Sequence, residues 1–463
     1  MTPSLTPSLR TMLADRLPAG RFSFDPVDVV AHAYDGSYRT AAPAAVVWPR
    51  SAAEVAAVLR GAAELGVAVF PRGAGTGLAG GSVPDGGIAL VLTGLSGTPA
   101  IDAENAQAEA DAGVTTAALQ AAAAAQGFLF PPDPSSAAMS TLGGNVATGA
   151  GGPRSFKYGT MKDYVLGLEA VAADGAILAT GGRTTKNATG YDLSRLLTGS
   201  EGTLAVLTRV RVRLVPLPPE QRTLAGVFPD LRRAGQALVA LARQRGPAAI
   251  ELMDQLSLRI VESVHHLGLP VSAAAVLIVE IDGWPEEVDP ASARAEALLR
   301  EHGGEVLHPE GRGSALWRAR KAISAAIARV KPTKVSEDVC VPRTAVPEML
   351  TRIAAIAARH DLILPVFGHA GDGNLHPNIV CDRRDADEMA RVELAVGELF
   401  EAALALGGTL SGEHGVGTMK APYLAAAAGE GAEAAMRAIK AAWDPKGILN
   451  PGKVFGPRGR FHG

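Results

Sequence analysis

Residues 71–81 read Pro-Arg-Gly-Ala-Gly-Thr-Gly-Leu-Ala-Gly-Gly and follow a short apolar run, residues 67–70, that is typical of a buried strand. The loop has the spacing G-x-G-x-x-G, which in a dinucleotide-binding Rossmann fold opens directly into a helix. Here the chain continues with Ser-Val-Pro-Asp-Gly-Gly at residues 82–87, and a proline with adjacent glycines stops a helix within its first turn. The sequence therefore excludes a Rossmann crossover. Successive backbone N–H groups in such a loop can still hold a phosphate, and a tight turn between two strands is the alternative interpretation.

Two further glycine-rich segments lie downstream of this loop. Residues 143–152 read Gly-Gly-Asn-Val-Ala-Thr-Gly-Ala-Gly-Gly and follow a Pro- and Ser-containing stretch at residues 131–136. We expect residues 131–157 to lack regular structure. Residues 199–203 read Gly-Ser-Glu-Gly-Thr. Three backbone-rich loops of this kind favour a long diphosphate ligand, which indicates a dinucleotide-sized cofactor held without a Rossmann helix.

The composition of the chain narrows the possible function classes. Of 463 residues, 47% are hydrophobic and 20% are charged, which is typical of a folded protein with a large core. The net charge of -3 offers no general attraction to nucleic acid or to an anionic membrane surface. The two cysteines cannot build a disulfide scaffold or an iron–sulfur cluster. With no transmembrane-length apolar run and no secretory-type N-terminus, we expect a cytoplasmic protein, with peripheral attachment to the inner membrane as the alternative.

The order of the expected elements divides the chain into four parts. Short apolar strands first alternate with helices such as residues 52–65, which begins with a capping box of Ser51 and Glu54. A cluster of prolines marks a boundary near residue 217. Beyond it, the order of strands and helices predicts β-α-β units in a ferredoxin-like α+β layer. The predicted parts are an N-terminal helical segment at 1–44, a cofactor domain at 45–217, a cap domain at 218–440 and a C-terminal segment at 441–463 that packs back on the cofactor domain.

Two histidines lie close together in the second half of the chain. They are His369 and His376, and the Gly-Asp-Gly-Asn turn between them lets both imidazoles approach one point. Further on, Glu413 stands beside His414 between glycines. Two imidazoles and one carboxylate with an open position are typical of a catalytic rather than a structural zinc site, and manganese or iron also accept such donors. The spacing alone supports a metal site and polar histidines in a core loop equally well.

Five of these segments together resemble the FAD-linked oxidase family of the vanillyl-alcohol oxidase type. They are residues 71–78, 141–145, 199–204, 368–376 and 412–415, in the order expected for that family. Within the family, the chain is most similar to the branch of D-lactate dehydrogenase, D-2-hydroxyglutarate dehydrogenase and the FAD subunit of glycolate oxidase. The likeness covers about residues 25–457. It implies an α+β fold in which a two-subdomain FAD-binding domain of the PCMH type is followed by a ferredoxin-like cap domain that carries the metal site.

The resemblance also implies roles in binding and oxidising the substrate. His414 matches the catalytic base of the family, Arg320 matches a carboxylate-binding arginine, and Asn378 matches a substrate contact. The lysine that some relatives place before a Val-Pro segment has no clean match, because Lys334 is offset from that position.

The cofactors implied by the resemblance are FAD and a divalent metal, zinc or manganese. Thr76 stands where relatives with covalently bound flavin carry a histidine, so we expect the FAD to be non-covalent. The metal ligands of the family match His369, His376 and Glu413. The positions that match its FAD contacts are Pro71, Arg72, Gly73, Ala74, Gly75, Thr76, Gly77, Pro134, Ser135, Gly143, Gly144, Asn145, Thr148, Gly149, Glu201, Gly202, Val206 and Asn450.

The resemblance implies oxidation of a D-2-hydroxy acid, such as D-lactate, glycolate or D-2-hydroxyglutarate, to the 2-oxo acid. The substrate would chelate the metal through its hydroxyl and one carboxylate oxygen, His414 would take the hydroxyl proton, and hydride would pass from C2 to flavin N5. A quinone, a cytochrome or an electron-transfer flavoprotein would then accept the electrons. The alternatives are a flavoprotein oxidase that uses O2 on another alcohol, and an FAD subunit of a multi-subunit glycolate oxidase with partner subunits.

Overall fold

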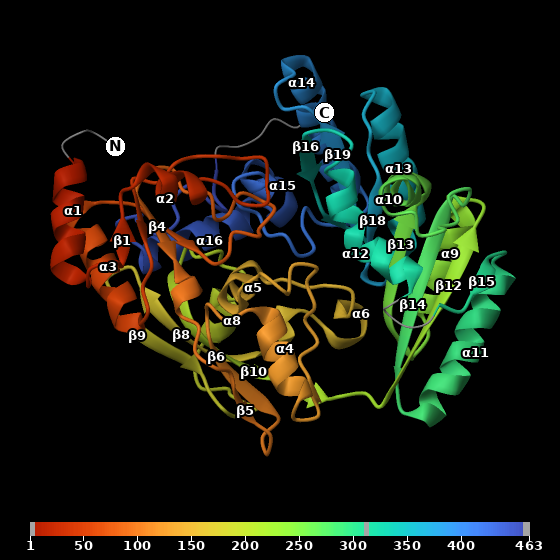
Figure 1. Cartoon of the computed structure of the whole chain (residues 1–463), viewed down its shortest axis with the longest axis horizontal. Helices are drawn as coiled ribbons and strands as arrows, with labels where there is room; N and C mark the ends of the chain where they lie inside the picture. Colours follow the sequence, from red (N-terminus) through yellow and green to blue (C-terminus); the bar gives the residue numbers. More distant parts are fainter. Residues whose placement is uncertain (1–4, 310–313, 457–463) are drawn as a thin grey trace. The chain divides into compact units, whose positions relative to one another are not determined.

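The structure of the chain is a computed structural model that describes residues 5–309 and 314–456. Residues 1–4 and 457–463, the ends of the predicted N-terminal and C-terminal segments, lie outside the described residues. The chain folds into two compact units, whose elements are labelled in Figure 1. Among the described residues, the first unit comprises residues 5–150, 160–217 and 413–456, and the second comprises residues 151–159, 218–309 and 314–412.

The first unit is built on two main sheets. In the strand order β1-β2-β4-β3, strands β2, β4 and β3 run parallel, whereas the order β5-β6-β10-β8-β9 is antiparallel throughout. Helix α3 shares one apolar core with both sheets, including Ile88 of β4 and Val171 of β8. The elements are α1 (Leu5–Arg16), β1 (Phe22–Ser23), α2 (Pro26–Ala31), β2 (Ala45–Val47), α3 (Ala52–Leu65), β3 (Val69–Arg72), β4 (Ile88–Val91), η1 (Leu92–Gly94), β5 (Ala100–Asp102), β6 (Gln107–Asp111), α4 (Thr116–Ala124), β7 (Phe128–Leu129), α5 (Leu142–Thr148), α7 (Met161–Tyr164), β8 (Val165–Ala172), β9 (Ile177–Gly181), α8 (Leu193–Leu197), β10 (Ala205–Arg213), β11 (Val215–Pro216), η5 (Ala421–Tyr423), α15 (Leu424–Ala428) and α16 (Glu430–Trp443).

Local signals explain the start and end of α3. The Ser51 hydroxyl accepts a hydrogen bond from the Glu54 amide at 3.2 Å, and the Glu54 carboxylate accepts one from the Arg50 amide at 2.8 Å. These bonds satisfy amides that the first turn of a helix leaves unpaired. Gly66, in the left-handed region with a φ of 64°, ends the helix. The prediction of a helix over residues 52–65 is confirmed.

The second glycine-rich segment differs from its prediction as an irregular loop. Residues 142–148 form helix α5, with Thr141 as its N-cap and Gly149 in the left-handed region as its C-cap. Glycine has a low helix propensity, but here its lack of a side chain is required by packing, because a Cβ on Gly143 would lie 2.5 Å from Cβ of Ala112. Tertiary packing thus overrides the local preference that the sequence pattern expressed.

The first glycine-rich segment has the predicted form. No helix occurs in residues 73–87, which connect the adjacent parallel strands β3 and β4. The C-terminal tail adds to the same sheet edge, because the Val69 amide donates to Ile448 O at 2.7 Å and the Asn450 amide donates to Val69 O at 2.8 Å. The tail residues Ile448 and Leu449 are buried in the core of this unit.

The second unit contains one antiparallel sheet in the order β15-β12-β14-β13-β18-β19-β16, with β17 paired to β19. Helices α10 and α12 cover one face of this sheet, where Met253 and Ile278 join their core. Helix α11 packs on the other face, where Leu299 contacts the position of Gly226. The elements are α6 (Ser155–Tyr158), β12 (Glu220–Phe228), α9 (Leu231–Ala242), β13 (Pro247–Asp254), α10 (Gln255–His265), β14 (Ala275–Gly283), α11 (Pro285–Glu301), β15 (Glu305–Leu307), α12 (Ala315–Ile327), β16 (Thr333–Ser336), β17 (Val339–Cys340), η3 (Arg343–Ala345), α13 (Val346–Arg359), β18 (Val366–His369), η4 (Ala370–Asp372), β19 (Asn374–Cys381) and α14 (Ala386–Ala405).

A short segment from the N-terminal half of the sequence, residues 151–159, belongs to this second unit. Its charged and polar side chains meet buried carboxylates on β14. The Lys157 Nζ donates to Oδ1 of Asp282 at 2.6 Å, and the Tyr158 hydroxyl is 2.9 Å from the same oxygen. Arg154 forms an ion pair with Glu280. Buried carboxylates require such partners, so these contacts fix the segment in the second unit.

Within the residues that the structure describes, none of the helices is long and apolar enough to traverse a lipid bilayer.

Candidate functional site

The two histidines selected from the sequence lie on one β-hairpin of the second unit. Strand β18 carries His369, the 3-10 turn η4 reverses the chain, and strand β19 carries His376. The register pairs Phe367 with His376 and His369 with Asn374. Because paired residues of antiparallel strands point to the same face, both imidazoles lie on one face of the sheet. Their ring centroids are 5.0 Å apart and the rings are nearly perpendicular.

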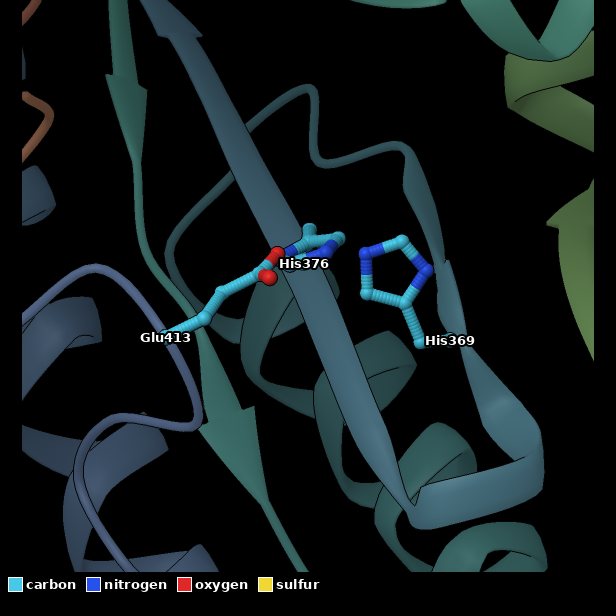
Figure 2. Close-up of side chains that lie close together, drawn as sticks. All are labelled: His369, His376 and Glu413. Atoms are coloured by element: carbon cyan, nitrogen blue, oxygen red, sulfur yellow. The ribbon is translucent and has the colours of Figure 1, made fainter. Parts of the chain in front are cut away.

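Glu413 joins the two histidines in a cluster that is suited to a divalent metal. Within the described residues, one ligand atom from each of His369, His376 and Glu413 lies within 4.8 Å of the other two. Figure 2 shows the three side chains pointing toward one another from β18, β19 and the loop at Glu413. Metal–ligand bonds of about 2.0–2.2 Å place two donors of one ion at most about 4.4 Å apart, which is of the same order as this spacing. The donor set of two neutral nitrogens and one carboxylate fits zinc or manganese.

A buried aspartate holds the backbone immediately before Glu413. Asp338 lies between β16 and β17, and its carboxylate accepts hydrogen bonds from the Gly412 amide at 2.7 Å and from the Ser411 hydroxyl at 3.0 Å. The division between the two units falls at the peptide bond from Gly412 to Glu413. Asp338 therefore fixes the backbone at Gly412, the residue before Glu413.

A residue that the sequence analysis missed, Glu251 on β13, contacts one of these histidines. Its side chain is fully buried, Oε1 is 2.7 Å from Nδ1 of His369, and Oε2 accepts a hydrogen bond from Nε of Arg320 at 2.6 Å. Burial alone would raise the pKa of Glu251, but the Arg320 guanidinium and the His369 ring outweigh it and hold that pKa below its usual value. A glutamate within the apolar run Ala-Ala-Ile-Glu-Leu-Met was the available signal.

Arg320 and Asn378, the residues predicted to bind the substrate, both belong to the second unit. Arg320 is buried on α12, and its Nη2 has no hydrogen-bond partner within the described residues. Ser324 lies one turn further along α12, and its hydroxyl accepts a hydrogen bond of 2.5 Å from Nζ of Lys334 on β16. Burial lowers the pKa of Lys334 to about 8. Lys334, which the sequence offset made doubtful as a substrate ligand, thus contacts the helix that carries Arg320.

Asn378 lies two residues after His376 on β19, so both side chains are on the same face of the strand. Its Nδ2 donates to His376 O at 2.8 Å, and its buried Oδ1 has no partner within the described residues. A buried polar atom without a partner is costly, and a bound ligand is one way to satisfy it.

The three glycine-rich segments predicted to bind the cofactor meet in the first unit, the second of them through its residues 143–150. A Cβ on Gly73 would lie 2.2 Å from the Thr141 hydroxyl, which shows how closely the first segment approaches α5. The Glu201 amide donates to Ala147 O at 2.8 Å, so the third segment is bonded to the second. Asn450 in the tail joins the first and third, since its Nδ2 donates to Gly81 O at 3.1 Å and to Glu201 O at 2.7 Å.

Several side chains predicted to contact FAD make contacts within the protein. The Arg72 guanidinium is buried and donates to Tyr34 O at 2.5 Å. The Asn145 amide donates to hydroxyls of Thr116 and Ser140, and Val206 lies in the apolar core. Ser135 is exposed, and Pro134 and Thr148 are half-buried. FAD contacts at these positions stay predictions. Where the side chain is already bonded within the protein, we expect the backbone of that residue to make the contact with FAD.

Glu201 and His414 lie on segments that are joined in the first unit. The Glu201 carboxylate accepts hydrogen bonds from the Val416 and Gly417 amides at 2.7 and 2.8 Å, and burial raises the pKa of Glu201 although these amides oppose it. His414, the predicted base, is half-buried two residues before Val416. Glu201 therefore anchors the loop that carries Glu413 and His414.

Two family profiles match this chain. The profile described as "FAD binding domain" matches residues 43–181, and the one described as "FAD linked oxidases, C-terminal domain" matches residues 217–454. With the α+β fold, these matches define the chain as an FAD-dependent oxidoreductase. The chain belongs to the family of FAD-linked oxidases, and the predicted resemblance is confirmed.

Named relatives match this chain over nearly their whole length. The glycolate oxidase subunit GlcD of Bacillus subtilis is 44% identical, over 89% of this chain and 89% of the relative. The D-lactate dehydrogenase of Archaeoglobus fulgidus is 38% identical, over 93% and 96%, and the D-2-hydroxyglutarate dehydrogenase of Xanthomonas citri is 33% identical, over 96% of each chain. The crystal structure of p-cresol methylhydroxylase with substrate bound is similar with a TM-score of 0.84 over 99% of this chain and 98% of the other. At 17% identity that likeness bears on the fold alone, and it confirms the predicted α+β fold.

Proposed function

We propose that this chain oxidises a small D-2-hydroxy acid to the 2-oxo acid with FAD as its cofactor. The names of its relatives, which include glycolate oxidase, D-lactate dehydrogenase and D-2-hydroxyglutarate dehydrogenase, support this reaction class. The single observation that carries the proposal is that Glu251 bonds both His369, a candidate metal ligand, and Arg320, a candidate carboxylate ligand. A 2-hydroxy acid carries its hydroxyl and its carboxylate on adjacent carbons. Binding it therefore calls for a metal that coordinates the hydroxyl and, close by, a cation that pairs with the carboxylate.

Arg320 and Lys334 would bind the substrate carboxylate. Nη2 of Arg320 is a buried donor without a partner in the described residues, and a carboxylate is the acceptor that a guanidinium pairs with best. Lys334, bonded to Ser324 one helical turn from Arg320, would supply a second charge. Asn378 would complete the set through its buried amide. A substrate with one carboxylate beside its hydroxyl suits this arrangement.

His414 would act as the base that takes the hydroxyl proton. His414 directly follows Glu413 in the sequence. Because Glu413 belongs to the cluster with His369 and His376, the backbone of His414 is joined directly to a candidate metal ligand. A neutral imidazole has a pKa suited to proton transfer near neutral pH. When bound, FAD would supply the two-electron acceptor and the divalent ion a Lewis acid that makes the hydroxyl easier to deprotonate.

The two parts of the chain would divide these tasks. We propose that residues 45–217, with the C-terminal segment 441–463, hold a non-covalent FAD, and that residues 218–440 hold the metal and the substrate. The electrons would leave to a quinone, a cytochrome or an electron-transfer flavoprotein from a cytoplasmic or membrane-peripheral location. A second candidate is the FAD subunit of a multi-subunit glycolate oxidase, and the name of the relative from Bacillus subtilis favours it.

Anaerobic reduction of the flavin tests the proposal. The FAD-loaded protein, without oxygen, is mixed in turn with D-lactate, L-lactate, glycolate and D-2-hydroxyglutarate, and loss of the oxidised-flavin absorbance is followed. We expect at least one D- or achiral acid to bleach the flavin and L-lactate to fail. Propionate, which lacks the hydroxyl, is the control. Bleaching by none of the acids, with a flavin that dithionite still reduces, would reject the proposed reaction.

A further inference from the structure

The buried carboxylate of Glu251 contacts a candidate metal ligand with one oxygen and a candidate substrate ligand with the other. Glu251 Oε1 is 2.7 Å from His369 Nδ1, and Oε2 is 2.6 Å from Arg320 Nε. The three side chains come from β13, β18 and α12, so no local sequence motif unites them. The exposed fractions of Glu251, His369 and Arg320 are 0%, 3% and 5%, so water does not screen these contacts.

On the histidine side, the contact selects one tautomer. With its proton on Nδ1 and directed at the carboxylate, the ring has Nε2 as the nitrogen that can coordinate a metal. A carboxylate at this position also fixes the ring orientation and makes the imidazole a stronger ligand. His369 therefore has a defined direction toward His376, whose ring lies nearly perpendicular at 5.0 Å between centroids.

On the arginine side, the same carboxylate sets the direction of the guanidinium. Nε is used by Glu251, and Cζ of Arg320 lies 4.7 Å from the centroid of the Phe367 ring. Two fixed contacts leave the planar group little freedom. Nη2 then remains as a buried donor with no partner in the described residues, held in one direction.

We propose that Glu251 is a positioning residue that sets the metal ligand His369 and the carboxylate ligand Arg320 in one geometry. The inference rests on the proposed function, because it assigns a role toward the metal and the substrate. Glu251 would act through these two side chains, which occupy both of its carboxylate oxygens. The competing explanation is that Glu251 only neutralises the buried charge of Arg320, and in that case metal binding would not depend on it.

The test compares Glu251→Gln with Glu280→Gln. Glu280 is an equally buried glutamate on the neighbouring strand β14, where it forms an ion pair with Arg154, so its variant controls for the loss of a buried charge. The single carbonyl oxygen of the introduced glutamine can accept from His369 or from Arg320, and its NH2 group then faces the N–H of the other. Mn²⁺ is titrated into the FAD-loaded, chelator-treated proteins, and bound metal is measured by electron paramagnetic resonance. KM and kcat for the acid that bleaches the wild-type flavin are measured in parallel.

We expect Glu251→Gln to weaken Mn²⁺ binding by about 10–100-fold, the usual effect of removing such a partner, and to raise KM as well. We expect Glu280→Gln to leave both near wild type. Wild-type Mn²⁺ affinity in a folded Glu251→Gln protein would overturn the inference, and it would leave the proposed function standing. A wild-type protein that binds no Mn²⁺ would overturn the metal site of the proposed function together with this inference.

Glu251→Asp provides a second variant if the glutamine protein does not fold. Aspartate keeps the charge, but its side chain is shorter by about 1.5 Å, so it cannot span both partners. We expect it to lose either metal affinity or substrate affinity, and wild-type values for both would overturn the inference.

Discussion

The Glu201 carboxylate accepts a hydrogen bond from the backbone amide of Val416 at 2.7 Å, across 215 residues of sequence. The amide of the next residue, Gly417, donates to the other carboxylate oxygen at 2.8 Å. Glu201 lies in the third glycine-rich segment, so this contact ties a predicted flavin-binding segment to the loop that begins with Glu413 and His414. The carboxylate thus bonds a distant loop, a contact that the sequence alone did not indicate, and its predicted contact with FAD stays a prediction.

Replacement of Glu201 by glutamine should loosen this loop. The amide oxygen can accept from only one of the two backbone N–H groups, and the other is left buried without an acceptor, at a cost of about 1–3 kcal/mol in the free energy of unfolding. We expect a lower Tm and a lower kcat, both from the same loosened loop. The control is Glu169→Gln, because the side-chain partner of Glu169 is the rotatable hydroxyl of Thr208. Equal Tm values for the two variants would contradict the anchoring role of Glu201.

His414→Ala should remove the proposed base and leave the flavin in place. General-base catalysis usually contributes about 10²–10⁴-fold, so kcat should fall by that factor. The flavin absorbance spectrum of the purified variant, compared with that of the exposed-site variant His265→Ala, checks that FAD is still bound. Near wild-type turnover by His414→Ala would rule out the proposed role.

Removal of divalent metal should suppress turnover reversibly. The cluster of His369, His376 and Glu413 offers three donors, so a chelator that competes for the ion should abolish activity, and added Zn²⁺ or Mn²⁺ should restore it. His376→Ala should be inactive before and after the same treatment. Unchanged rates in a protein shown by elemental analysis to be metal-free would contradict a catalytic metal.

The alkaline limit of substrate binding should follow Lys334. Its pKa is lowered by burial to about 8 from the ordinary value of 10.5, so the ammonium group needed to pair with a carboxylate disappears as the pH rises through about 8. We expect kcat/KM to fall above that pH. The free energy of unfolding should change with pH in the opposite sense, because burial disfavours the charged form of Lys334 in the folded chain. The buried charge lowers this free energy fully below pH 8. The loss disappears as the pH rises from 8 to 10.5.

Two variants identify the group that titrates. Lys334→Arg, which stays charged, should extend the plateau of kcat/KM to higher pH. Lys331→Arg, at a lysine paired with Glu388, should leave the profile unchanged. A fall of kcat/KM near pH 8 that persists in Lys334→Arg would assign the limit to another group.

Sequence reasoning succeeded where the signal is local. The cap of α3 at Ser51 involves residues within one turn, and the turn predicted between His369 and His376 occurs at η4. It failed where a distant contact decides. Helix α5 forms through glycines because Gly143 must pack against Ala112, and Glu251 meets His369 across 118 residues of sequence. The pattern of a single sequence can predict that a residue is buried, but it does not predict which distant residue it contacts.

No local pattern in the sequence predicted that residues 151–159 belong to the second unit. These residues lie between predicted elements of the cofactor domain, yet Lys157 and Tyr158 bond Asp282 in the second unit. The charges of these residues are ordinary for a solvated loop. The burial of Asp282 and Glu280, two carboxylates that require partners, explains where the segment lies.

Gly75→Ala should weaken FAD binding far more than Gly86→Ala, a matched change in the same stretch of chain. Both glycines lie in the left-handed region, with φ of 72° and 66°, so both variants bear the strain of about 1–2 kcal/mol that a side chain adds there. They differ in space: a Cβ at residue 75 would lie 2.0 Å from Nη2 of Arg72, whereas none of the described atoms lies within 4 Å of one at residue 86. Arg72 is buried and bonded to Tyr34 O, so it cannot swing into solvent, and the loop must move instead. FAD content and Kd after removal and re-addition of the flavin measure the effect. Equal affinities in the two variants would show that this loop does not hold the cofactor.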